Sequence, residues 1–166
     1  HSTMSTHCRR LSLGLCLACI ALILACSREA PPSPELVVRA VTEKPFSEVI
    51  FQLEHAITEH NFRITGRNKI GEGLRERGYD DFPDVEVIHF CNLELAREVL
   101  LIDPGFIAQM PCRITVHSTQ HGQIISLILL PENHLDERVN IFARRMNGIL
   151  REIARFVLEE DLPETP

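Results

Sequence analysis

The most regular hydrophobic pattern lies near the C-terminus, where apolar residues recur in steps of four and three. The positions are Leu135, Val139, Phe142, Met146, Ile149, Ile153 and Phe156. This spacing places the apolar side chains on one face of a helix of about 25 residues. Asn133, with Asp136 three residues later, resembles a capping box, so we expect the helix to begin there.

Two shorter helices are predicted by the same periodicity. The first begins at Pro45 or Ser47 and ends at Asn61, in a position that often requires a left-handed backbone. The second is capped by Asn92 and stops at Asp103, where a proline and a glycine follow.

Five short runs rich in apolar and β-branched residues predict strands. They span residues 36–41, 62–68, 85–91, 113–118 and 123–130. The last two form a hairpin around His121 and Gly122, and a glycine-bracketed helical turn is expected at residues 71–78. This order predicts an α+β domain of two layers, with a mostly antiparallel sheet and helices on one of its faces.

The run from residue 124 to 130 is apolar on both alternating sides. A sheet covered on one face shows polar residues on the other, so this strand needs cover on both sides. We expect Ile125, Leu127 and Leu129 to lie on the open sheet face. Loops of the same chain could close that face, or a second copy or a small apolar ligand could cover it.

Residues 4–25 have the three parts of a secretion signal, and residues 1–3 are interpreted as a cloning remnant. Two arginines, Arg9 and Arg10, precede an apolar run that ends at the small residue Ala25. As a helix this run spans about 21 Å, which is short of the roughly 30 Å hydrocarbon layer of a membrane. We therefore expect a signal peptide rather than a membrane span.

The signal ends in Ile23-Leu24-Ala25-Cys26, which resembles the lipobox of bacterial lipoproteins. The resemblance implies that Cys26 is acylated and becomes the first residue of the mature chain. Membrane lipid would then hold the protein on the periplasmic face of a bacterial membrane. Ser27, in place of an aspartate, favours the outer membrane.

Processing would leave a proline-rich tether at residues 26–35, one α+β domain at 36–160 and a tail at 161–166. Residues 1–25 hold two of the 17 basic residues and none of the 23 acidic ones, so the net charge of −6 becomes −8. Such an acidic chain argues against a nucleic-acid partner, because no basic stripe is present to bind phosphates.

Three motifs carry a family resemblance: Phe90-Cys91-Asn92, Asp103-Pro104 and Met110-Pro111-Cys112. Their spacing resembles that of the bacterial domain-of-unknown-function family numbered 302, over about residues 36–158. The resemblance implies a TATA-binding-protein-like fold of order β-α-β4-α, with the Asn92 helix as an insertion, and a homodimer. It brings no established activity.

Once the signal is removed and Cys26 is acylated, Cys91 and Cys112 are the only thiols left. They could form a disulfide that closes a loop of about 20 residues, lie buried as separate thiols, or be exposed and react or bind metal. His89 and Cys91 share one face of a strand, so His89, Cys91 and Cys112 could bind copper or zinc. Alternatively, His89 faces water, and no cofactor is then expected.

No sequence signature of a hydrolase, a phosphate-binding loop or a zinc protease occurs. The acidic stretch from Glu72 to Asp84 is interpreted as a solvated face. We therefore expect a lipid-anchored periplasmic binding or accessory protein rather than an enzyme, with itself, an envelope protein or a small apolar ligand as partner. The alternative is a thiol module that handles copper, zinc or sulfur through Cys91 and Cys112.

Overall fold

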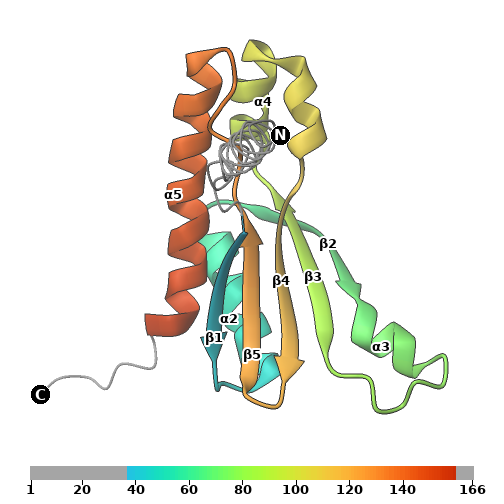
Figure 1. Cartoon of the computed structure of the whole chain (residues 1–166). Coiled ribbons are helices and arrows are strands. Elements are labelled where there is room, and N and C mark those ends of the chain that lie inside the picture. The colour runs from blue at the N-terminus through green and yellow to red at the C-terminus, as the bar shows by residue number, and fades with distance from the viewer. Residues whose placement is uncertain (1–36, 160–166) are drawn as a thin grey trace, which may run out of the picture. The chain divides into compact units, whose positions relative to one another are not determined.

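Five strands form one antiparallel sheet in the computed structural model, which describes residues 37–159 (Figure 1). The strands are β1 (Val37–Thr42), β2 (Arg63–Lys69), β3 (Val85–Cys91), β4 (Cys112–Thr119) and β5 (Gly122–Ile128). Their order across the sheet is β1-β5-β4-β3-β2, so the first two strands of the chain form its edges. The predicted α+β class is confirmed.

The predictions for the N-terminal and C-terminal segments lie outside the described residues. They concern the cloning remnant, the signal peptide, acylation of Cys26, the tether and the tail at 161–166. Among the helices that the structure describes, none is long and apolar enough to cross a membrane.

Two long helices, α2 and α5, cover one face of the sheet, and α2 lies behind the strands in Figure 1. The helical segments are α2 (Phe46–Glu59), α3 (Ile70–Arg75), α4 (Leu93–Ile102), the 3-10 helix η1 (Pro104–Gln109) and α5 (Glu137–Glu159). The core lies between the two layers and includes Leu53 and Ile57 of α2, Ile88 and Ile114 of the sheet, and Ile153 of α5. Each such side chain contributes roughly 1.5–3 kcal/mol by leaving water.

Polar residues set the helix ends as predicted at two positions. Asn61, just beyond α2, has a φ of 59°, the left-handed conformation that an asparagine tolerates. The side chain of Asn92 accepts hydrogen bonds from the backbone N–H groups of Glu94 and Leu95 and so caps α4.

The predicted start of the last helix was three residues too early. Asp136, not Asn133, caps α5, because its carboxylate accepts the backbone N–H of Arg138 at 2.9 Å. Leu135 therefore precedes the helix and is fully exposed instead of joining the apolar face. Leu135 has the spacing of the helical apolar face, although it lies in the loop before the helix.

The prediction for the open face was wrong. Ile125, Leu127 and Leu129 are 1%, 1% and 5% exposed and pack in the core beneath the helices. The alternate residues Ile124 and Ile128 of β5 point to the other side. Because both sets are apolar, the sequence of this strand does not distinguish the two faces.

The face of the sheet opposite the helices is called the open face below. It carries Val37, Arg39 and Val41 of β1, Ile124, Ser126 and Ile128 of β5, Arg113, Thr115 and His117 of β4, and Val85, Val87 and His89 of β3. These residues are half-buried or exposed and alternate with residues that are buried or packed against the core. The register pairs Arg39 with Ser126 and Ser126 with Thr115, so they form continuous rows across the strands.

The hairpin between β4 and β5 depends on a glycine. Gly122 pairs with Thr119 and has a φ of 113°, a conformation that other residues rarely adopt. A Cβ atom at this position would collide with the carbonyl oxygen of Thr42. The pairing of β4 with β5 confirms the predicted hairpin, and Gln120 and His121 are its loop residues.

Asn147 joins α5 to the segment that leaves β5. Its amide oxygen accepts the backbone N–H of Leu130 at 2.8 Å, and its amide nitrogen donates to the Leu130 carbonyl at 2.9 Å. The amide nitrogen also donates to Glu132 at 2.7 Å. Asn147 and Leu130 are both buried, at 1% and 6% exposed, whereas Glu132 is exposed.

We expect Asn147→Ala to lower the free energy of unfolding by about 2 kcal/mol, because it leaves two buried backbone groups of Leu130 without partners. Asn133→Ala, an exposed asparagine, is the control and should change stability by less than about 0.5 kcal/mol. Denaturant unfolding of both variants measures the difference. Equal effects would show that the paired hydrogen bonds of Asn147 do not stabilise this junction.

Candidate functional site

Cys91 and Cys112 lie at one end of the sheet, where β3 ends and β4 begins. Phe90 of β3 pairs with Cys112, which makes the two cysteines neighbours across the strand pair. The chain between them forms α4 and η1 and then returns to the sheet. Both cysteines are half-buried free thiols, so the disulfide that was one of three alternatives is not formed.

The two thiols line one small cavity of about 30 Å³. Apart from Asn92 and Gln109, the other lining residues are apolar: Phe62, Leu95, Ala96, Phe106, Met110, Leu130, Phe142 and Met146. The rings of Phe106 and Phe142 meet edge to face, with centroids 5.7 Å apart. A cavity of this volume holds a guest about the size of one water molecule.

Burial controls the acidity of the thiol of Cys112. Removal from water, followed by the proximity of Cys91, raises its pKa from 9.0 to about 11. Cys112 is therefore a protonated thiol at neutral pH and is a poor nucleophile, since the thiolate is the reactive form.

The structure does not bring His89, Cys91 and Cys112 together as the predicted metal set. The ring Nε2 of His89 lies 2.9 Å from the side-chain oxygen of Asn68 on the neighbouring strand, and His89 does not line the thiol cavity. Within residues 37–159, no three His, Cys, Asp or Glu side chains are grouped so that they could hold a metal ion. The strand period correctly put His89 and Cys91 on one side, but β3 ends at Cys91, where its side chain joins the cavity.

Sequence reasoning missed the two methionines of this cavity. Met146 was assigned to the apolar face of the last helix, and Met110 was noted only as part of a motif. The Met-Pro-Cys motif, which places Met110 two residues before Cys112, could have indicated Met110, whereas no sequence signal indicates Met146.

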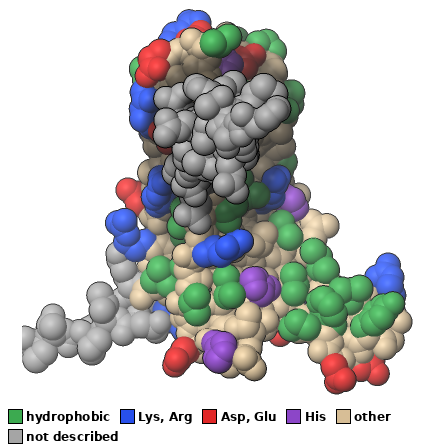
Figure 2. All heavy atoms as spheres, in the orientation of Figure 1, with side chains coloured by type: hydrophobic (Ala, Val, Ile, Leu, Met, Phe, Trp, Pro, Cys, Tyr) green, Lys and Arg blue, Asp and Glu red, His purple; other side chains and the backbone are tan. Residues whose placement is uncertain are grey.

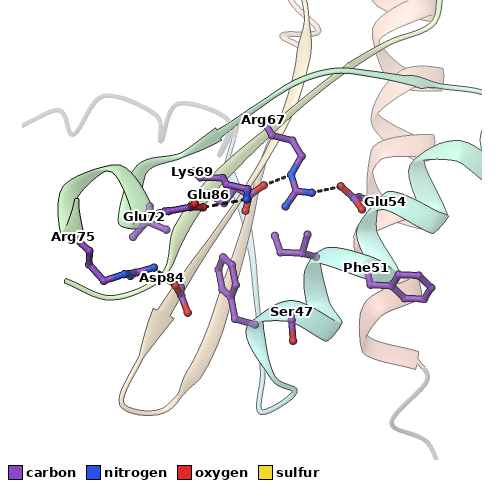
Figure 3. Close-up of a pocket in the computed structure, with 12 residues that line it drawn as sticks. Ser47, Phe51, Glu54, Arg67, Lys69, Glu72, Arg75, Asp84 and Glu86 are labelled. Carbon is purple, nitrogen blue, oxygen red and sulfur yellow. Dashed lines mark hydrogen bonds and ion pairs between the residues drawn. The ribbon is translucent and has the colours of Figure 1, made fainter. Parts of the chain in front are cut away.

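A larger, charged pocket of about 370 Å³ lies between α2 and the segment from β2 to β3 (Figure 3). Phe46, Ile50 and Phe51 of α2 form its apolar side. The opposite side carries three cations and three carboxylates: Arg67, Lys69, Arg75, Glu72, Asp84 and Glu86. Glu72 and Asp84 are thus ion-paired members of a pocket and not only parts of a solvated face.

Arg67 is the central residue of this charged wall, as Figure 3 shows. Its guanidinium binds Glu86 of β3 and lies 2.7 Å from Glu54 of α2, and these carboxylates raise its pKa. Lys69 pairs with Glu72 at 3.1 Å, and Arg75 pairs with Asp84 at 2.8 Å. All four carboxylates that line the pocket have a cationic partner, so the arrangement ties α2 to the sheet.

We expect Arg67→Met to lower the free energy of unfolding by about 2 kcal/mol, because it leaves the buried carboxylate of Glu86 without its cation. Adding Glu86→Gln should restore part of the loss, because the buried charge is then removed. Arg138→Met breaks an exposed ion pair with Asp136 and should lower stability far less, because solvent screens that pair. Denaturant unfolding that gave both single variants equal stability would contradict this role of Arg67.

We expect Cys112 to alkylate slowly. A pKa of about 11 instead of 9.0 leaves about a hundredfold fewer thiolates at neutral pH, and the rate should rise about tenfold per pH unit up to pH 11. Timed iodoacetamide labelling and peptide mass spectrometry measure the rate, with the urea-unfolded chain as the control. A native Cys112 that reacts as fast as the unfolded one would exclude the buried thiol.

Comparison with known proteins gives a family and a fold. The model of the family described as "Domain of unknown function DUF302" matches residues 37–155. The chain is similar to a solved structure described as the crystal structure of an uncharacterized conserved DUF302 protein from Bacillus stearothermophilus. The match has a TM-score of 0.66 and 18% identity, and it covers 74% of this chain and 98% of the other. No curated protein matches. The predicted family is confirmed: the chain belongs to the DUF302 family.

Proposed function

We propose that this DUF302 domain is a membrane-tethered binding module whose open face docks an acidic segment of an envelope protein. One observation carries the proposal: the open face combines apolar and cationic side chains and has no carboxylate among its strand residues. In the five strands the only acidic residue is Glu86, which lies on the helix-covered side and binds Arg67.

The arginines of the open face have no carboxylate partner in the described part of the chain, which is also true of Arg63, Arg77, Arg97 and Arg151. Arg39 and Arg113 are exposed, and neither forms an ion pair with any residue in the described part of the chain. Five arginines outside this face each have a carboxylate partner: Arg67, Arg75, Arg138, Arg144 and Arg145. The charges of the open face are thus left for a partner to neutralise.

Apolar side chains lie in a row beside these cations. Val41 pairs with Ile124, Ile124 with His117, and His117 with Val85, so the row crosses four strands. Val41 is 58% exposed, although it is a large apolar residue in a strand. Where Figure 2 leaves this face in view, hydrophobic, arginine or lysine, and histidine side chains occupy it, and acidic side chains lie at its margins. An amphipathic segment with carboxylates on one side complements both features.

This composition does not favour a second copy as the occupant. Two open faces packed together would bring Arg39 and Arg113 of each copy into a shared interface without any carboxylate from the strands to pair with them. Like charges in such an interface cost free energy. The homodimer implied by the family resemblance stays a prediction that sedimentation of the protein can test.

The sequence supports the location in this proposal. The signal peptide and the lipobox ending in Cys26 attach the chain to a bacterial membrane on the periplasmic side. The tether at residues 26–35 can extend over about 30 Å, which keeps the domain close to the membrane and its envelope partners.

We expect the full chain, in nonionic detergent, to bind fluorescent poly-L-glutamate despite its own net charge of −6, and to release it as salt is raised. Arg39→Glu with Arg113→Glu should weaken binding about tenfold or more, because two attractions become repulsions. The matched control is Arg97→Glu with Arg151→Glu, which reverses two exposed helix arginines and should have a smaller effect. Fluorescence anisotropy measures the affinities.

Two outcomes would overturn the proposal. Equal losses in the two double variants would show that only net charge matters. Binding to phosphatidylglycerol vesicles, but not to poly-L-glutamate, would assign the open face to lipid instead of an acidic polypeptide.

A further inference from the structure

We infer that the cavity between Cys91 and Cys112 is a binding site for a single Cu(I) ion. The inference concerns the opposite end of β3 from the charged pocket, and it does not depend on what the open face binds. It replaces the His89 set, which the structure does not assemble, with a set in which sulfur is the only strong donor.

The residues around the cavity supply soft donors and little else. Two thiols come from Cys91 and Cys112, and two thioethers come from Met110 and Met146. No histidine, aspartate or glutamate lines the cavity. Soft sulfur ligands favour Cu(I), zinc and iron–sulfur clusters, whereas carboxylates and carbonyls suit magnesium, calcium and manganese.

The size of the cavity limits the guest. About 30 Å³ accommodates one atom-sized guest but no organic molecule of ordinary size. The site also has an edge open to solvent, because both cysteines are half-buried and Gln109 is exposed. An ion can therefore enter past Gln109 without separation of the strands.

Charge favours a monovalent ion over a divalent one. When Cu(I) binds, one thiol loses its proton to water and forms a copper–thiolate bond, and the thioethers donate as neutral ligands. The copper remains in its reduced state throughout, and the complex has no net charge. Zn²⁺ would need two thiolates for neutrality and usually takes four strong ligands, of which this cavity offers two. Burying an uncompensated charge among Phe62, Phe106 and Phe142 is costly.

The test uses the full chain with its four other cysteines changed to serine, so that Cys91 and Cys112 are the only thiols. The changes are Cys8→Ser, Cys16→Ser, Cys19→Ser and Cys26→Ser. Under anaerobic, reducing conditions in detergent, Cu(I) is titrated against the chelator bicinchoninate. We expect one Cu(I) per chain, one proton released per Cu(I), and X-ray absorption that shows sulfur neighbours only. Zn²⁺ should not displace the copper.

Three further variants separate the site from the fold. Cys112→Ser should weaken Cu(I) binding by more than about 100-fold, which exceeds the loss when a residue only orients a ligand. Met146→Leu keeps the volume of the side chain and should weaken binding without loss of stability. His89→Ala is the matched control and should leave the affinity unchanged, because His89 is bound to Asn68.

The inference is overturned by any of three results: no Cu(I) binding by the parent chain, unchanged affinity in Cys112→Ser and Met146→Leu, or nitrogen neighbours that disappear in His89→Ala. The last result would restore the histidine set that the sequence suggested. Circular dichroism of each variant establishes that a loss of copper is not a loss of fold.

Discussion

The pairing register of the sheet is the constraint on which the rest of the structure depends. One row of paired residues crosses all five strands on the helix-covered side: Val38, Leu127, Ile114, Ile88 and Arg67. The row beside it, from Arg39 through Ser126 and Thr115 to Val87, lies on the open face. Because side chains alternate along a strand, a slip of one residue would exchange the two faces and bury Arg39 and Arg113. The burial of the apolar row therefore also fixes where the unpaired cations lie.

The same register accounts for the two pockets. The covered row is apolar in its first four members and ends at Arg67 on the edge strand β2, where α2 meets the sheet through the ion pairs with Glu54 and Glu86. At the other end of β3, the pairing of Phe90 with Cys112 brings the thiols together under α4 and η1. One end of the strand is thus held by charge and the other by apolar packing around sulfur. Neither arrangement requires the other.

Sequence alone predicted the features that depend on local rules. The class of fold, the family, and the caps at Asn61 and Asn92 follow from periodicity, short motifs and backbone preferences of single residues. The errors arose at positions where two alternative structures are predicted equally well by the same sequence pattern. Ile125 and Ile124 are both apolar, so burial against α2 and α5 decided which one faces the core. Asn133 and Asp136 can both cap a helix, and His89 shares a strand face with Cys91. The charged pocket was missed because Arg67 and Glu86 lie nineteen positions apart and meet only through the pairing of β2 with β3.

The connection between β3 and β4 consists of α4 and η1, where a tight turn would have sufficed to join two adjacent antiparallel strands. The strands keep six pairs of their own, so this connection can unfold locally while the sheet stays intact. Any opening of the sulfur-lined cavity beyond its edge at Gln109 is then governed by a smaller free energy than global unfolding. The rate at which a guest leaves the cavity and the rate at which the whole domain unfolds are therefore separate properties. Sequence changes within the connection can alter the first without altering the second.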